Sequence, residues 1–463
     1  MRGNLGRNSF GIIYLGLLAG TIGTKGVPVT VTLENLADTL QTLFTTEADQ
    51  AAEDSGLIQR RRKISGAGFV RTLVFGWLDD PKATIDDLGD ELGVSKQGLD
   101  QRLDDRAADC LWRVVQAALQ RTVAAHPEAI PLLRRFPGVV VDDCTSLGLP
   151  AELARQFPGC GGSDPEDGQA GLKLLIRWDV TSGQFQALES AAARDSERTL
   201  AQRLPAMSPG DLHLADLGFF DLGELAELSR QGVHWISRVP APVNQRADDG
   251  TTEELADWLK RRRGDRIDQP IRLGTRKQLE CRLVAVRLPE EVARKRLRDL
   301  KKKLKKKGRT ISGRRRVLCQ WLVLITDLAA DAFRIEEIFV LYRVRWQVEL
   351  LFKRWKSLAG LGRSRGHRAY RVLCETYAKL LGCLVQHWGT LVRGGPLSRT
   401  SAYKRAKQVR RFAAKIAAAL DDTAALLRVL KDFAARLRRI PRQDKRHRRP
   451  NMRQFLFGPR LVF

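Results

Sequence analysis

The chain has 463 residues, 43% of them hydrophobic, and carries 80 lysines and arginines against 53 acidic residues, for a formal net charge of +27. This composition is typical of a folded protein and excludes disordered and collagen-like chains, and the length suits about two to four domains. The seven cysteines are scattered without a CxxC pair, so neither a zinc site nor a disulfide framework is expected.

An apolar stretch near the start, residues 10–23, is interrupted by glycines and is shorter than the roughly 20 residues that a membrane span needs. Arg2 and Arg7 precede it, as in a signal peptide, but no small-x-small cleavage site follows. We therefore expect no membrane partner and no secretion. The unpaired cysteines favour a cytoplasmic location.

Residues 1–130 are predicted to form helices separated by polar breaks, and residues 84–103 have the layout of a helix-turn-helix. Gly93 permits the turn, and Ser95 can cap the second helix. A short helix pair without a role in binding has the same pattern and is the alternative. The candidate DNA-contacting side chains of the second helix are Lys96, Gln97 and Gln101.

From residue 136 the pattern changes to strand-like runs, of which 138–141 is β-branched and 212–215 alternates between apolar and polar residues. The runs 138–141 and 212–215 are predicted strands that end in aspartates, and the run 172–178 is the first strand of a predicted hairpin. A helix from Asp221 to about residue 232 and further strands follow, which indicates an α/β core. Adjacent strand residues face opposite sides, so only one of Asp142 and Asp143 can point into a site.

Residues 241–320 interrupt this pattern with polar sequence that is poor in predicted strands. The lysine-rich run 301–307 lacks an apolar face, so we expect a flexible or DNA-tracking loop within an insertion. Residues 293–316 contribute a charge of +13 and residues 341–463 contribute +24, which leaves −10 for all the others. Such asymmetry favours a nucleic-acid partner, with anionic lipid or a merely solvated basic protein as alternatives.

Residues 335–358 are predicted to form a helix. At about 100° per residue, four polar side chains fall within a stripe about 60° wide beside its apolar face. They are Tyr342, Arg345, Glu349 and Lys356. An exposed stripe of ion pairs is the alternative.

Glu349 can converge with Asp143 and Asp216, which follow two predicted strands. Clustered carboxylates repel one another and require a cation, and hard oxygen ligands suit Mg²⁺ or Mn²⁺. Two such ions can activate a water or a 3′-hydroxyl and stabilise the leaving oxygen in phosphodiester chemistry.

The spacing Tyr342-x2-Arg345-x3-Glu349-x6-Lys356 closely resembles the Y-R-E-K motif of bacterial DDE transposases of the "IS four" group of insertion sequences. Segments 143–147 and 216–220 resemble the other two acidic motifs of that family, although Leu217 stands where members often have Arg. The resemblance covers about residues 65–370.

The resemblance implies an α/β protein with an RNase H-like, retroviral-integrase-like catalytic domain at residues 131–370 and a β-rich insertion at about 241–320. It also implies an all-helical DNA-binding region at residues 1–130 and a basic helical region at 371–463 that takes part in pairing. The expected activity is cut-and-paste transposition, with hydrolysis at transposon ends and strand transfer into target DNA by a homodimer in a synaptic complex.

By the same resemblance, Asp143, Asp216 and Glu349 hold two Mg²⁺ or Mn²⁺ ions, and Asp143 is preferred to Asp142. Tyr342, Arg345 and Lys356 are then expected to contact the phosphates of the transposon ends. Trp258 or Trp321 would stack on a flipped base, unless both belong to the core. A metal-dependent nuclease, a DNA-binding regulator and a catalytically decayed transposase are the alternatives.

Overall fold

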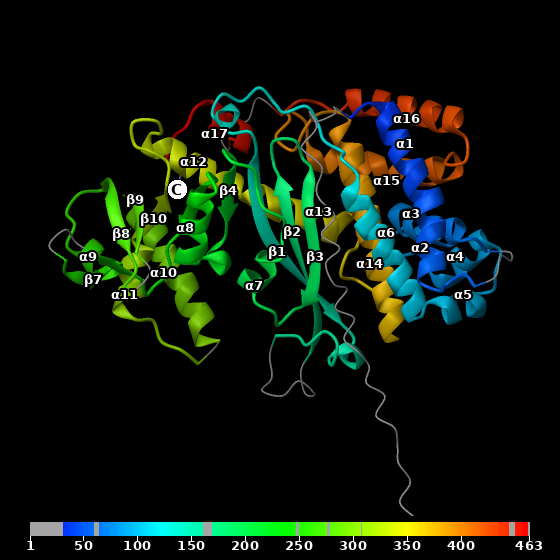
Figure 1. The fold of residues 1–463 in the computed structure, drawn as a ribbon, viewed down its shortest axis with the longest axis horizontal. Helices are drawn as coiled ribbons and strands as arrows, with labels where there is room; N and C mark the ends of the chain where they lie inside the picture. Colours follow the sequence, from blue (N-terminus) through cyan, green and yellow to red (C-terminus); the bar gives the residue numbers. More distant parts are fainter. Residues whose placement is uncertain are drawn as a thin grey trace, which may run out of the picture.

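The computed structural model describes residues 31–59, 64–160, 169–246, 250–275, 278–306, 308–443 and 450–461. A ten-stranded mixed sheet lies between a large group of helices and a smaller group that belongs to the insertion (Figure 1). The apolar stretch 10–23 lies outside the described residues. Within them, no helix is both long enough and apolar enough to cross a bilayer.

The described residues of the N-terminal region form helices from residue 33 onward. Its helices are α1 Leu33–Thr42, α2 Ala48–Asp54, α3 Gly66–Asp79, α4 Ile85–Leu92, α5 Lys96–Arg102 and α6 Asp105–Gln120. Helices α4 and α5 form the predicted pair, because Gly93 adopts a left-handed conformation (φ 71°) and Ser95 accepts a hydrogen bond from the amide of Gly98. Leu88 and Leu99 bury the apolar sides of the pair.

The first five strands form one half of the sheet. They are β1 Val139–Leu149, β2 Ala170–Asp179, β3 Phe185–Ala192, β4 Leu212–Ala215 and β5 His234–Arg238, joined in the order β3-β2-β1-β4-β5. Strands β1, β4 and β5 are parallel, whereas β2 and β3 pair as antiparallel strands, which agrees with the predicted hairpin. The short helix α7 Glu197–Ala201 precedes β4, and α8 Leu222–Arg230 follows it. The strands predicted from the strand-like runs are thus confirmed.

Residues 241–320 contain several strands, as the family resemblance implies, so the expectation of few strands from their polar sequence is wrong. They contain β6 Asn244–Arg246, β7 Thr252–Glu254, α9 Leu255–Lys260, β8 Arg266–Leu273, β9 Leu279–Arg287, α10 Glu290–Lys305 and α11 Gly313–Cys319. Strand β8 was missed because only Ile267, Ile271 and Leu273 are buried among charged and polar neighbours. The next strand, β10 Trp321–Thr326, pairs with both β5 and β9, so the insertion continues the core sheet in the order β5-β10-β9-β8-β6-β7.

The loop expected at the lysine-rich run is also wrong up to Lys305, where α10 ends. Leu297, Leu300 and Leu304 recur at three- and four-residue spacing and form a narrow inner stripe of the helix. Arg296 adds a hydrogen bond of 3.0 Å to the carbonyl oxygen of Trp321. The lysines occupy the exposed sides of the helix, which is why the sequence shows no broad apolar face.

The predicted helix 335–358 consists of two helices, α12 Ile335–Val344 and α13 Trp346–Leu358. Arg345 lies at the junction, where the bonds Arg345 N to Tyr342 O and Val348 N to Arg345 O span only three residues. The later helices are α14 Ala369–Leu391, α15 Ala402–Ala418, α16 Thr423–Arg438 and α17 Met452–Phe457. The basic run 438–449 lies only partly within the described residues.

Helix α14 is buried along almost its whole length and packs against α3, α6 and α15 (Figure 1). The N-terminal and C-terminal helices therefore share one core. His387 of α14 fixes the β2–β3 hairpin to this core, because its Nε2 lies 2.6 Å from the carbonyl oxygen of Gly183 and its ring lies 4.6 Å from that of Phe185. Burial lowers the pKa of His387 to about 3.

We expect the stability of the protein to fall as the pH drops below about 6.5, because the unfolded chain then binds a proton at residue 387 that the folded chain excludes. The pKa of His387 is about 3 in the folded state. The free energy of unfolding should fall by about 1.4 kcal/mol per pH unit from this residue, or about 2 kcal/mol by pH 5. His387→Gln keeps a donor for Gly183 and should remove this loss, whereas His126→Gln, at an exposed position, should not. Equal pH profiles of the two variants in urea unfolding would contradict the assignment.

Candidate active site

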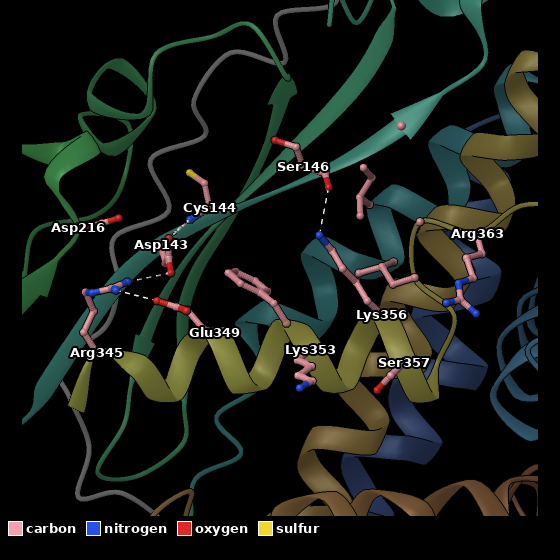
Figure 2. A pocket seen from close by; sticks show the side chains of 15 residues that line it. Asp143, Cys144, Ser146, Asp216, Arg345, Glu349, Lys353, Lys356, Ser357 and Arg363 are labelled. Atoms are coloured by element: carbon pink, nitrogen blue, oxygen red, sulfur yellow. Dashed lines mark hydrogen bonds and ion pairs between the residues drawn. The ribbon is translucent and has the colours of Figure 1, made fainter. Parts of the chain in front are cut away.

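An open pocket of about 740 Å³ lies between β1 and α13. Carboxylates from three distant parts of the chain line it together with several basic side chains. The charged lining residues are Asp143, Asp216, Arg345, Glu349, Lys353, Lys356 and Arg363. Three of the four residues of the predicted helix stripe therefore meet the two predicted acids at one place (Figure 2).

Asp143 faces this pocket from β1, and Asp142 faces the opposite side of the sheet. Parallel pairing with β4 places residue 142 beside Ala215, so Asp143 lies close to the strand end at which Asp216 stands. Burial raises the pKa of Asp143 to about 6 although Arg345 opposes this change, and the acids Asp216 and Glu349 add to it. Asp143 is thus a carboxyl group whose charge is costly unless a cation is near.

Asp142 is fully enclosed and forms an ion-pair hub with two neighbouring strands. Arg177 of β2 donates two hydrogen bonds to its carboxylate, of 2.9 and 2.6 Å, and Nε2 of His213 on β4 lies 3.1 Å away. Burial alone would raise the pKa of Asp142, but Arg177 and His213 hold it well below its usual range. The two adjacent aspartates therefore serve different purposes, and the preference for Asp143 agrees with their orientation.

Asp216 follows β4 directly and lines the pocket. Its Oδ1 is buried and has no hydrogen-bond partner among the described residues. An orphaned carboxylate oxygen is unfavourable in a folded protein and points to a missing positive partner. The hydroxyl of Tyr342 donates a bond of 3.3 Å to the carbonyl oxygen of Ala215, one residue before Asp216.

Arg345 connects the acids of the strand and the helix. Its guanidinium donates to Oδ2 of Asp143 over 3.3 Å and to Oε1 of Glu349 over 2.7 Å (Figure 2). The break between α12 and α13 lies at this residue. As the side chains lie, Arg345 neutralises both carboxylates.

Lys356 lies two turns after Glu349 on α13 and donates a bond of 3.2 Å to the carbonyl oxygen of Ser146. Burial lowers its pKa. Tyr342 is placed differently from the rest of the stripe, because it packs against the end of β4 instead of lining the pocket, and burial raises its pKa to about 12.

Two basic lining residues were missed by the sequence reasoning. Lys353 stands four residues after Glu349, so its helical position could have revealed it. Arg363 stands in the connection after α13, where no periodic pattern operates. Cys144 also lines the pocket, but burial raises the pKa of its thiol, which argues against a nucleophile.

The remaining predicted residues lie elsewhere. Lys96, Gln97 and Gln101 are exposed on α5 and do not line the pocket. Trp258 and Trp321 are 6% and 1% exposed and belong to the core of the insertion, so neither indole is free to stack on a base. Trp346, beside Arg345, is by contrast 54% exposed.

The donor set of the pocket suits a hard divalent cation, because it consists of carboxylate oxygens with one orphaned atom on Asp216. Within the described ranges, however, no three His, Cys, Asp or Glu side chains are gathered closely enough to hold one ion as they stand. Arg345 bonds to both Asp143 and Glu349 and so occupies two of the candidate ligands. Ligand chemistry thus fits a metal site, with Arg345 as a competitor for two of its ligands.

Comparison with known proteins gives consistent matches. A family model described as "Transposase DDE domain" matches residues 134–384. The chain is 27% identical over 378 residues to a transposase for insertion sequence element IS231F of Bacillus thuringiensis subsp. israelensis, covering 75% of this chain and 78% of the relative. It is 26% identical over 367 residues to a transposase for element IS1151 of Clostridium perfringens, covering 73% and 76% of the two chains.

The opposite roles of the adjacent aspartates predict opposite effects on stability. Asp142→Ala should lower the free energy of unfolding by about 3–5 kcal/mol, because it leaves Arg177 buried without its counter-ion. Asp143→Ala removes a carboxylate whose burial already disfavours its charge, so it should leave the stability unchanged or raise it. Urea unfolding at neutral pH measures both. Similar losses in the two variants would show that the hub does not stabilise the fold.

Proposed function

The chain belongs to the DDE transposase family, a class of metal-dependent enzymes that cleave DNA and transfer strands, and on that premise we propose that Asp143, Asp216 and Glu349 are its three catalytic acids. The family domain implies an RNase H-like fold, which agrees with the mixed sheet of strands β1–β5. The proposed reaction is cut-and-paste transposition, with hydrolysis at the ends of an insertion sequence and joining of those ends to target DNA.

One observation carries this proposal. The three acids are separated by 73 and 133 residues in the sequence, yet they line one pocket together with Lys353 and Lys356. A structural ion-pair network would not need an orphaned oxygen on Asp216. Phosphodiester chemistry requires acidic side chains that bind metal ions and, beside them, positively charged side chains that bind phosphate.

We propose that these acids hold two Mg²⁺ or Mn²⁺ ions, which when bound activate a water or a 3′-hydroxyl and stabilise the leaving oxygen. Asp143 and Asp216 are fixed by neighbouring parallel strands, and Glu349 by α13. Tyr342 supports the end of β4 through its bond to Ala215 and is a positioning residue in this scheme. Arg345 can release the carboxylates and turn to a phosphate when the acids are neutralised otherwise.

The partner is DNA, consisting of transposon ends and a target duplex, and we propose that a homodimer brings two ends together in a synaptic complex. Lys356 and Lys353 supply positive charge along the outer edge of the pocket. The exposed Lys96, Gln97 and Gln101 of α5 are proposed to read the end sequence in a major groove. Because the substrate is the bacterial chromosome, we place the activity in the cytoplasm at the nucleoid.

Glu349→Ala tests the catalytic assignment. With Mg²⁺ or Mn²⁺ and DNA that carries the sequences flanking this reading frame, excision and joining should fall by about 10³-fold or more, the equivalent of about 4 kcal/mol in the barrier. End binding should survive, because the substitution removes a ligand and not a DNA contact. Asp331→Ala, which removes an exposed carboxylate in the loop before α12, is the matched control and should keep full activity.

Three outcomes separate the alternatives. Cleavage without joining of a supplied 3′-hydroxyl end would indicate a nuclease. Binding without chemistry in the parent protein would indicate a regulator or a decayed enzyme. Activity that persists in Glu349→Ala would overturn the assignment of the acids.

Substitutions on α5 test the DNA-reading role of this helix. Gln97→Ala with Gln101→Ala should reduce the preference for the end sequence over an unrelated duplex by about 1–3 kcal/mol per base contact. Lys96→Ala should weaken binding to both duplexes equally. Competition binding against an unrelated duplex measures the ratio. Gln231→Ala, at an exposed position at the end of α8, serves as the control. An unchanged preference in the glutamine variants would show that α5 is a packing element only.

A further inference from the structure

An arginine-rich connection lies at the mouth of the pocket, between α13 and α14. We call residues 360–368 the arginine loop. Gly360 and Gly362 begin it in left-handed conformations, with φ of 66° and 81°. The chain passes so close to β1 at Gly362 that a Cβ atom there would lie 2.9 Å from the side chain of Leu147. The loop is therefore tied to the strand that carries Asp143.

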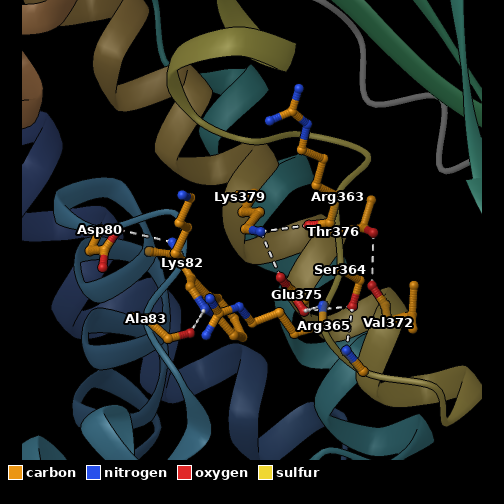
Figure 3. Close-up of polar contacts among 12 residues, drawn as sticks. Asp80, Lys82, Ala83, Arg363, Ser364, Arg365, Val372, Glu375, Thr376 and Lys379 are labelled. Atoms are coloured by element: carbon orange, nitrogen blue, oxygen red, sulfur yellow. Dashed lines mark hydrogen bonds and ion pairs between the residues drawn. The ribbon is translucent and has the colours of Figure 1, made fainter.

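A buried ion pair beneath the loop sets its shape. Glu375 and Lys379 stand one turn apart on α14, are 4% and 2% exposed, and lie 2.6 Å from each other. Nζ of Lys379 also donates to the carbonyl oxygen of Arg363 over 2.7 Å, and the hydroxyl of Ser364 donates to Glu375 over 2.6 Å (Figure 3). We call this pair the clamp.

Burying two charges is costly unless every remaining donor and acceptor is satisfied. Here the loop supplies those partners, because Glu375 also accepts a hydrogen bond of 3.4 Å from the backbone amide of Arg365. Three consecutive residues of the loop are thereby held to one helix. Helix α14 is already buried among apolar neighbours. The clamp therefore stabilises the conformation of the loop and is not needed to form the helix.

The loop also reaches the predicted DNA-reading helices. Arg368 at the end of the loop and Arg371 in the first turn of α14 form ion pairs of 2.9 and 3.0 Å with Asp100 of α5. Gly360 lies against Pro81, just before α4. The loop thus spans the distance between the pocket and the α4–α5 pair.

Two arginines of the loop remain available. Arg363 and Arg365 are exposed, and no ion pair joins either of them to another residue in the described ranges. Arg363 lines the pocket near Lys356, while Arg365 lies toward α4, where its charge lowers the pKa of Asp87 after the larger effects of the Thr84 hydrogen bonds. Two guanidinium groups are thus held on a fixed backbone, with one near the acids and one near the helix pair.

We propose that the arginine loop is a phosphate-binding bridge, in which Arg363 and Arg365 contact the backbone of a DNA strand that runs from the pocket to α4 and α5. Glu375 and Lys379 are positioning residues that hold the bridge in shape. The inference rests on the proposed function, because it assumes that DNA enters the pocket. The arginine loop would set the path of the DNA strand and connect the end sequence bound at α4 and α5 with the reacting end in the pocket.

Salt-dependent binding tests the bridge without any chemistry. A fluorescent duplex with the flanking end sequence is titrated with the full chain in EDTA at several salt concentrations. Each lost phosphate contact lowers the slope of log K against log salt concentration by about 0.9, so Arg363→Ala with Arg365→Ala should lower it by about 1.8. Lys260→Ala with Arg263→Ala removes the same charge at exposed positions near α9, on the far side of the molecule, and should leave the slope unchanged (Figure 1).

The clamp is tested with both arginines in place. Glu375→Gln with Lys379→Met removes both buried charges together and should lower the slope by a similar amount, because the loop no longer holds the guanidinium groups. Combining it with the two arginine substitutions should lower the slope no further. Ser364→Ala, which removes only the hydroxyl bond to Glu375, provides a milder variant if the double variant unfolds, and circular dichroism reports folding.

The outcomes are distinguishable from failure of the proposed function. An unchanged slope in the arginine variant, with metal-dependent cleavage intact, would overturn the bridge and leave the catalytic assignment in place. A loss of slope in a protein that cleaves no DNA would support the bridge and overturn the catalytic role. A clamp variant that loses thermal stability but keeps the full slope would reduce the pair to a structural role, and a parent protein that binds no DNA would overturn both proposals.

Discussion

The arrangement of the pocket depends on the parallel pairing of β1 with β4 and on the buried charges that hold the two strands together. Asp142 bonds to Arg177 on β2 and lies beside His213 on β4, so one carboxylate connects three strands. The next residue, Asp143, points to the opposite side and meets Asp216 and Glu349 at the pocket. The two neighbouring aspartates thus have different roles. Ion pairs stabilise the buried charge of Asp142, whereas burial makes the charged form of Asp143 unfavourable.

Much of the core could be predicted from local patterns. Apolar and alternating runs identified β1, β2, β4 and β10, and Gly93 with Ser95 identified the α4–α5 pair. The acids could be found because Asp143 follows a run of valines, although β1 continues beyond it, Asp216 follows β4, and Glu349 occupies a regular helix stripe. The spacing of Arg345, Glu349 and Lys356 can be recognised in the sequence without knowledge of the rest of the fold.

The features that were missed depend on partners far away in the sequence. Strand β8 and helix α10 bury narrow apolar stripes between charged residues, so their composition resembles that of a loop. Arg345 stands at the break between α12 and α13, and one of its partners, Asp143, lies 202 residues away. Arg363 owes its position to Lys379 and Glu375, whose burial no local pattern shows. Polar contacts between distant segments thus limit what the sequence alone can reveal.

The insertion also changes the borders of the sheet. Without β10 and the strands beyond it, β5 would present an unpaired row of backbone donors and acceptors to the surroundings, and such edges invite other chains to add strands. Pairing with β10 closes that row, and the sheet ends instead at β7, which spans only Thr252–Glu254. At the other border, β3 is packed by α6. Short or covered border strands of this kind protect the chain against edge-to-edge aggregation.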